Sequence, residues 1–203
     1  MTLTSERRRV GVFGGTFDPI HRGHVDVAEE CAVALDLDPV LMIPSNLPPH
    51  RDPPQASAED RLAMVRLAVE GHDRLVASDI EVRRGGVSYS VDTIRALAAE
   101  HPDAALTLLL GWDAAAEFKD WHGADEIRRL ARVAVFNRAA TPSPPGIALE
   151  SLGLPADAIR LEVDSPPVSS TSVRQMLADQ GAGTGDLPPA VAAYINMHNL
   201  YRE

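Results

Sequence analysis

The chain has 203 residues, of which 45% are hydrophobic and 24% charged, with a net charge of −10 at pH 7. A chain of this size can fold as one α/β domain without a disulfide or a structural metal. The acidic balance argues against non-specific binding to nucleic acid or an anionic membrane. The single cysteine, Cys31, excludes a disulfide framework and favours a reducing compartment. No apolar run approaches the roughly 18 residues of a membrane span, so we expect a soluble, cytoplasmic protein.

Strand and helix patterns alternate along the whole chain. Strands are expected at residues 9–13, 39–43, 75–82 (interrupted), 105–110, 133–136 and 159–163. Helices are expected at residues 25–35, 57–69, 91–100, 126–131, 169–178 and 188–198. Ser57 and Asp60 form a capping-box pattern, and Ser88 or Ser90 is expected to cap the third helix. Residues 138–158 are the least patterned.

This order of elements predicts a Rossmann-like, doubly wound α/β fold. Its sheet should be mostly parallel, with helices on both faces and a single domain. In such folds the ligand lies beyond the carboxyl ends of the strands. Candidate functional residues are therefore expected directly after strands.

The densest chemical signal follows the first strand. There the chain reads Gly14-Gly15-Thr16-Phe17-Asp18-Pro19-Ile20-His21-Arg22-Gly23-His24. Paired glycines let a backbone approach a ligand closely, and a helix start offers free N–H groups and a positive dipole end to phosphate. His21 and His24 project from the same side of the first helical turn and could donate hydrogen bonds to phosphoryl oxygens. Half of a metal site, or a purely structural histidine pair, are the alternatives, although two imidazoles are too few ligands for zinc.

This eleven-residue segment resembles the signature of the HxGH nucleotidyltransferases. With Asp-Pro-Ile and a histidine at the first HxGH position, it is most similar to the bacterial nicotinate-nucleotide adenylyltransferases. Four later segments are similar to the same family in the same order: Pro44-Ser45-x-x-Pro48-Pro49-His50-Arg51, Ser88-Tyr89-Ser90-x-Asp92-Thr93, Gly111-x-Asp113 with Phe118-x-x-Trp121, and Val168-Ser169-Ser170-Thr171-x-x-Arg174. The family more often has lysine at Arg51 and threonine at Ser90.

The resemblance implies one nucleotidyltransferase domain over residues 1–203, with residues 169–201 completing the ATP site. It implies a reaction of ATP with nicotinate mononucleotide that gives nicotinate adenine dinucleotide and pyrophosphate, a step of NAD biosynthesis. Direct in-line attack would need no covalent enzyme intermediate. Mg²⁺ would arrive with ATP, held by its oxygens and water, so no protein metal site is expected.

Site residues are carried over position by position. The implied catalytic residues are Thr16, His21 and His24. The implied ATP-binding residues are Gly14, Gly15, Thr16, Phe17, His21, Gly23, His24, Gly111, Asp113, Ser169, Ser170, Thr171 and Arg174. The implied mononucleotide-binding residues are Gly15, Ser45, His50, Arg51, Ser90, Thr93, Trp121 and His122.

Each later segment alone has an ordinary structural interpretation. Ser169 could simply cap a helix, and Trp121 could belong to the core. Arg174 lies one turn into that helix, however, so its guanidinium and the cap would form a second anion site. The alternative functions are an adenylyltransferase for the amide mononucleotide or for both, a cytidylyltransferase, and a non-catalytic nucleotide sensor. The oligomeric state stays open, a homo-oligomer included.

Overall fold

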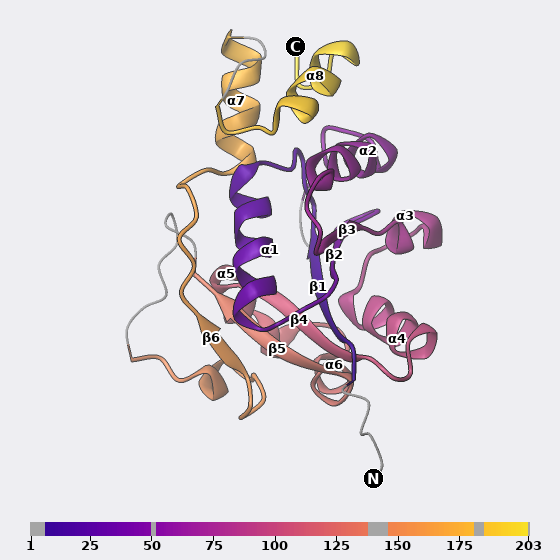
Figure 1. Cartoon of the computed structure of the whole chain (residues 1–203), viewed down its shortest axis with the longest axis vertical. Coiled ribbons are helices and arrows are strands. Elements are labelled where there is room, and N and C mark those ends of the chain that lie inside the picture. The colour runs from indigo at the N-terminus through magenta and orange to yellow at the C-terminus, as the bar shows by residue number, and fades with distance from the viewer. Residues whose placement is uncertain (1–6, 50–51, 138–145, 181–184, 203) are drawn as a thin grey trace.

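The computed structural model describes residues 7–49, 52–137, 146–180 and 185–202. Six strands form one sheet in the order β3-β2-β1-β4-β5-β6, and every neighbouring pair is parallel (Figure 1). The strands are β1 (Arg9–Gly15), β2 (Val40–Pro44), β3 (Leu75–Ala77), β4 (Ala105–Gly111), β5 (Ala131–Phe136) and β6 (Ile159–Leu161). The predicted doubly wound, single-domain fold is confirmed.

Helices pack on both faces of this sheet. One core contains side chains of α1 (Arg22–Ala34), α2 (Ala58–Val69), α7 (Ser170–Gln180) and α8 (Pro189–Met197). The opposite core contains side chains of α3 (Ile80–Arg84), α4 (Ser90–Glu100), α5 (Trp112–Ala116) and α6 (Ala124–Leu130), with the short 3-10 helices η1 (Phe118–Asp120) and η2 (Leu149–Leu152). In Figure 1, α7 and α8 lie beyond the end of the sheet at which α1 begins.

Successive strand residues face opposite cores, as the period of a strand requires. In β1, Val12 packs with α4 and α6, whereas its neighbour Phe13 packs with α1. In β4, Leu108 and Leu109 divide in the same way. Burial on both faces explains why these strands appear in the sequence as continuous apolar runs.

One predicted strand is wrong in its extent. The run 75–82 forms strand only over Leu75–Ala77, and α3 begins at Ile80 after the N-cap residue Asp79. The backbone N–H of Ser78 donates to the carbonyl of Met42, and Arg83 then donates to Asp79 in helical fashion. Because β3 lies at the edge of the sheet and pairs only with β2, nothing beyond Ser78 extends the ladder.

The predicted helix caps have different outcomes. Ser57 caps α2 as predicted, since its hydroxyl accepts the N–H of Asp60 at 3.0 Å. Neither Ser88 nor Ser90 caps α4, where Tyr89 is the N-cap and makes no side-chain cap bond. The Ser88 hydroxyl instead accepts the N–H of Asn46 at 2.8 Å. It therefore joins the loop after β2 to the start of α4.

The least patterned stretch lies partly outside the described residues, which omit 138–145. Its described remainder contains η2 (Leu149–Leu152) and no further strand before β6. Among the described residues, no helix is both long enough and apolar enough to cross a membrane.

Candidate active site

The site residues gather at the point in the sheet where the order of the strands reverses. The chain leaves β1 toward β2 on one side, whereas β4 leads to β5 on the other. Glycines end the two central strands, β1 and β4. Gly14 and Gly15 end β1, and Gly111 ends β4. The carboxyl ends of strands at such a reversal form the usual ligand crevice of an open α/β sheet.

The two histidines of the turn after β1 are held together at the start of α1. Their rings stack at 3.7 Å between centroids, and the side chains lie inside the protein, with His21 2% and His24 8% exposed. Nδ1 of His24 accepts the backbone N–H of His21 at 3.3 Å. A neutral His24 ring therefore carries its proton on Nε2.

The Phe17 ring packs against His24 of this pair. The two rings meet edge to face at 5.0 Å, and the Phe17 backbone has the left-handed φ of 49°. A Cβ on Gly15 would lie 2.9 Å from the Phe17 ring, and one on Gly23 would lie 2.9 Å from Val168. Gly14 has nothing within 4 Å of such a position. Two of the glycines thus allow tight packing, and the third leaves open space at the end of β1.

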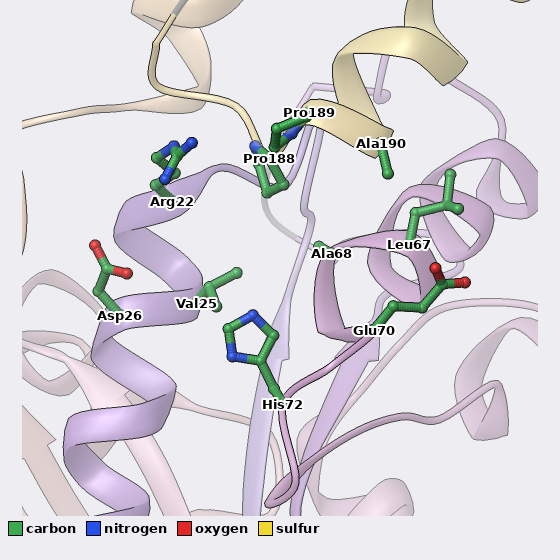
Figure 2. A pocket seen from close by; sticks show the side chains of 10 residues that line it. All are labelled: Arg22, Val25, Asp26, Leu67, Ala68, Glu70, His72, Pro188, Pro189 and Ala190. Carbon is green, nitrogen blue, oxygen red and sulfur yellow. The ribbon is translucent and has the colours of Figure 1, made fainter.

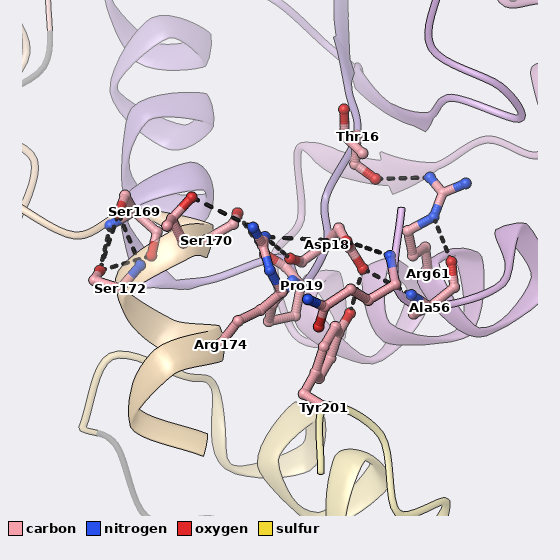
Figure 3. Close-up of polar contacts among 12 residues, drawn as sticks. Thr16, Asp18, Pro19, Ala56, Arg61, Ser169, Ser170, Ser172, Arg174 and Tyr201 are labelled. Atoms are coloured by element: carbon pink, nitrogen blue, oxygen red, sulfur yellow. Dashed lines mark hydrogen bonds and ion pairs between the residues drawn. The ribbon is translucent and has the colours of Figure 1, made fainter. Parts of the chain in front are cut away.

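The helix α7 contacts the turn through its predicted phosphate-binding residues (Figure 3). The Ser170 hydroxyl donates to the carbonyl of Pro19 at 3.0 Å, and Nη1 of Arg174 donates to the carbonyl of Asp18 at 2.7 Å. The Ser169 hydroxyl caps the helix by accepting the N–H of Ser172 at 3.1 Å. The structure therefore places two motifs, about 150 residues apart in the sequence, side by side.

Asp18, absent from the predicted set, organises this contact. Its carboxylate accepts the N–H groups of Gln55 and Ala56 and, at 2.7 Å, the hydroxyl of Tyr201. Burial, and then the Asp18 carboxylate, raise the pKa of the Tyr201 phenol. Tyr201, near the end of the chain, is in this way tied to the turn, a link that no local sequence pattern predicts.

Arg61 of α2 is a second residue that sequence reasoning missed. It is 1% exposed, and its three donor groups reach backbone carbonyls of Thr16, Asn46 and Ala56. Burial lowers the pKa of its guanidinium, opposed in part by the charge of Asp18. The available signal was a charged residue on the apolar face of α2, which also carries Met64 and Val65.

The predicted mononucleotide-binding residues occupy the other side of the crevice. Ser45 is 8% exposed, and its hydroxyl has no hydrogen-bond partner among the described residues. Trp121 and Ser90 are partly exposed, and the exposed ring of His122 lies 4.7 Å from that of Tyr89. His50 and Arg51 lie outside the described residues.

Thr93 and Asp113 differ sharply in exposure. The Thr93 hydroxyl is buried and donates to Glu81 at 2.6 Å, while Arg84 donates to it in turn. Burial raises the pKa of Glu81. Asp113 is exposed in the first turn of α5, directly after Gly111. Thr93 thus faces the interior, and the carboxylate of Asp113 faces solvent.

A hollow of about 370 Å³ lies between α1, the end of α2 and the start of α8 (Figure 2). None of the predicted site residues that the structure describes lines it. Its ionisable groups carry both signs, among them Arg22 and Asp26, and His72 is already paired with Glu29 at 2.6 Å. This hollow therefore offers no concentrated positive charge to a nucleotide. In the described part of the chain, no group of three or more histidine, cysteine or acidic side chains is arranged to hold a metal.

The fold and this site define a nucleotidyltransferase. The family model described as cytidylyltransferase-like matches residues 12–176. Two curated relatives named "Probable nicotinate-nucleotide adenylyltransferase" cover nearly the whole chain. The one from Synechococcus sp. is 39% identical over 97% of this chain and 98% of its own length, and the one from Pseudomonas fluorescens is 41% identical over 96% and 98%.

A solved structure gives the same architecture. The Plasmodium falciparum nicotinic acid mononucleotide adenylyltransferase complexed with NaAD superposes with a TM-score of 0.77 over 96% of this chain and 97% of its own. At 16% identity that likeness concerns the fold. From the curated relatives, the chain belongs to the nicotinate-nucleotide adenylyltransferase family within the cytidylyltransferase-like class. The resemblance found in the sequence is confirmed.

Proposed function

We propose that this chain joins Mg²⁺-bound ATP and nicotinate mononucleotide to give nicotinate adenine dinucleotide and pyrophosphate. The observation that carries the proposal is the geometry of His24. Its Nδ1 accepts the backbone N–H of His21, which leaves the proton of a neutral ring on Nε2 at the start of α1. A helix start of this kind attracts phosphate.

In the proposed reaction, a phosphate oxygen of the mononucleotide attacks the α-phosphorus of ATP. The new P–O bond forms as the bond to the β-phosphate oxygen breaks in line, and the electron pair leaves with pyrophosphate. His24 and Thr16 contact the α-phosphate, and His21 lies on the leaving side. These groups stabilise the developing charge. Because the mononucleotide phosphate is itself the nucleophile, no protein side chain becomes covalently attached.

The remaining ATP contacts come from the second motif. Ser169, Ser170, Thr171 and Arg174 bind the β- and γ-phosphate oxygens in this proposal. Their support is the placement of α7 against the turn, with Nη1 of Arg174 on the Asp18 carbonyl. Phe17, Gly23 and Gly111 shape the pocket through their backbone, and the exposed Asp113 accepts hydrogen bonds from the ribose hydroxyls.

Recognition of the pyridine ring belongs to the opposite side of the crevice. Trp121 stacks on the ring, while Ser90 and the N–H groups after Trp121, including that of His122, meet the nicotinate carboxylate. Ser45 binds with its buried hydroxyl, which has no hydrogen-bond partner in the part of the chain that the structure describes. The roles of His50, Arg51 and Thr93 as further contacts stay predictions.

In this proposal, Mg²⁺ arrives as part of the nucleotide substrate. ATP oxygens and water hold Mg²⁺, which prefers phosphate and water ligands. We also propose a cytoplasmic location, which the single cysteine supports. Burial raises the pKa of the Cys31 thiol to about 12, so it stays protonated and inert.

Product analysis tests the function. The purified protein is incubated with Mg²⁺, ATP and nicotinate mononucleotide, and the products are identified by mass spectrometry. We expect nicotinate adenine dinucleotide and pyrophosphate in equal amounts, and little product when CTP replaces ATP. Preference for CTP would instead identify a cytidylyltransferase, and nucleotide binding without any product would identify a sensor.

A further inference from the structure

We propose that Arg61 is a positioning residue that fixes the turn carrying ATP relative to the loop carrying the mononucleotide. The ATP turn is defined here as residues 14–24 and the mononucleotide loop as the described residues 45–49. The proposal rests on the proposed adenylyl transfer, because it assigns Arg61 a part in bringing the two phosphates together. No atom of Arg61 needs to touch either substrate.

Strand pairing holds the two segments together only up to a certain point. The β1–β2 ladder ends at Gly15 and Pro44, and one further bond joins the Ser45 N–H to the Gly15 carbonyl at 2.9 Å. Beyond this bond the β1–β2 ladder offers no further pairing between the two segments. The side chain of Arg61 makes a further connection between them.

The guanidinium forms this connection with separate nitrogens. Nη1 donates to the carbonyl of Thr16 at 2.7 Å, and Nη2 donates to the carbonyl of Asn46 at 3.0 Å. Nε donates to the carbonyl of Ala56 at 3.2 Å, which anchors the group just before α2 (Figure 3). A planar group with several fixed donors can hold two carbonyls at one separation, whereas an ammonium is a single point charge.

Stability alone gives a weak reason for this arginine. It is among the largest fully buried side chains of the described residues, and its hydrogen bonds go to neutral carbonyls. Burying a charge is costly unless it is fully paired, and an apolar residue among Met64 and Val65 would pack α2 without that cost. What the guanidinium adds is a fixed distance between the two substrate loops.

The consequence for catalysis is specific. Each substrate still binds its own segment when the connection is weakened, so both KM values should change little. The approach of the mononucleotide phosphate to the α-phosphorus should become less exact, and a misplacement of about 1 Å can cost on the order of 100-fold in rate. Weakening the Arg61 connection should therefore lower kcat.

The experiment compares Arg61→Lys and Arg61→Gln with Arg74→Lys. Arg74 is the control: its Nη1 also donates to a backbone carbonyl, that of Ala32 at 3.2 Å, it also pairs with Asp36, and it directly precedes β3, at the amino ends of the parallel strands. Steady-state kcat and both KM values are measured by pyrophosphate release, with the melting temperature of each protein. The glutamine variant introduces no buried charge and therefore tests the connection with less cost to folding.

We expect kcat to fall about 10- to 100-fold in both Arg61 variants, with each KM within about threefold of the parent value. Arg74→Lys should keep its kcat even where its melting temperature falls. Normal kcat in a folded Arg61 variant, a loss confined to KM, or failure of both variants to fold would overturn the proposal. Failure of the proposed function is recognised separately, because the parent protein itself would then release no pyrophosphate.

Discussion

The two sides of the candidate site differ in how firmly the fold holds their side chains. In the ATP turn both histidines are almost fully buried, and the carbonyls of Thr16 and Asp18 are each bound by an arginine. On the mononucleotide side, Trp121 is partly exposed and His122 is exposed. The proposed charge-stabilising groups are thus preorganised, and the groups proposed to select the pyridine ring remain accessible.

This difference has a physical rationale. Groups that stabilise a transition state are most effective when they need no rearrangement during the reaction. Groups that recognise a ring must admit it first, and a flat aromatic surface such as Trp121 can bind by stacking with few fixed hydrogen bonds. Substitutions on the two sides should therefore have different kinetic signatures.

The largest effect is expected for His24→Ala. Loss of one preorganised donor should lower kcat by about 10²–10³-fold. Because the ring is buried against Phe17, we also expect a lower stability, by about 1–3 kcal/mol. The kinetic assay is therefore run well below the melting temperature, with His101→Ala as the control. Near-normal turnover of His24→Ala would contradict the assigned role.

A smaller effect is expected for Arg174→Ala. The β- and γ-phosphates belong to ATP alone, so KM for ATP should rise by about 10- to 100-fold, the scale of a hydrogen bond to a charged group. KM for the mononucleotide should hardly change. An equal rise in both values would indicate that Arg174 acts only through its bond to the Asp18 carbonyl.

On the mononucleotide side, Trp121→Ala should raise KM for both the acid and the amide mononucleotide by about tenfold, since stacking does not sense the ring substituent. Ser90→Ala should change the preference between them instead, by about two- to tenfold. Parallel titrations with the two mononucleotides measure both effects. A change of preference in the tryptophan variant would mean that its ring does more than stack.

The smallest effect is expected for the buried carboxylate of Glu81, which accepts a hydrogen bond from the Thr93 hydroxyl. Burial raises the pKa of Glu81 above its ordinary value of 4.5, so the folded protein holds this proton more tightly than the unfolded chain. Stability should consequently fall as pH rises from about 4.5 through the folded pKa. Urea titrations of Glu81→Gln should lack this component. Parallel pH profiles for the parent and the variant would contradict the assignment.

The sequence predicted the parts of the site that follow strands. Gly14, His24 and Gly111 could be placed at one edge, because carboxyl ends of parallel strands share that edge. The contact of Arg174 with Asp18 depends on the docking of α7, which no local pattern contains. Arg61 was missed for the same reason, since its partners are carbonyls of three separate segments.

Local patterns also failed where two structures were close in propensity. The apolar run 75–82 is rich in strand-forming residues, yet it divides into β3 and α3 because an edge strand gains pairing from one side only. Ser88 has the residue type of a helix cap, but its hydroxyl is used by the N–H of Asn46. In both cases tertiary contacts decided the outcome.

The most direct test measures pyrophosphate release from Mg²⁺-bound ATP with nicotinate mononucleotide and with nicotinamide mononucleotide in parallel. The two differ at one ring substituent, and a mismatched buried donor costs about 1–3 kcal/mol. We therefore predict that kcat/KM for the acid exceeds that for the amide by at least about tenfold. Equal values would leave a dual-specificity adenylyltransferase, and no release with either mononucleotide would contradict adenylyl transfer to a pyridine nucleotide.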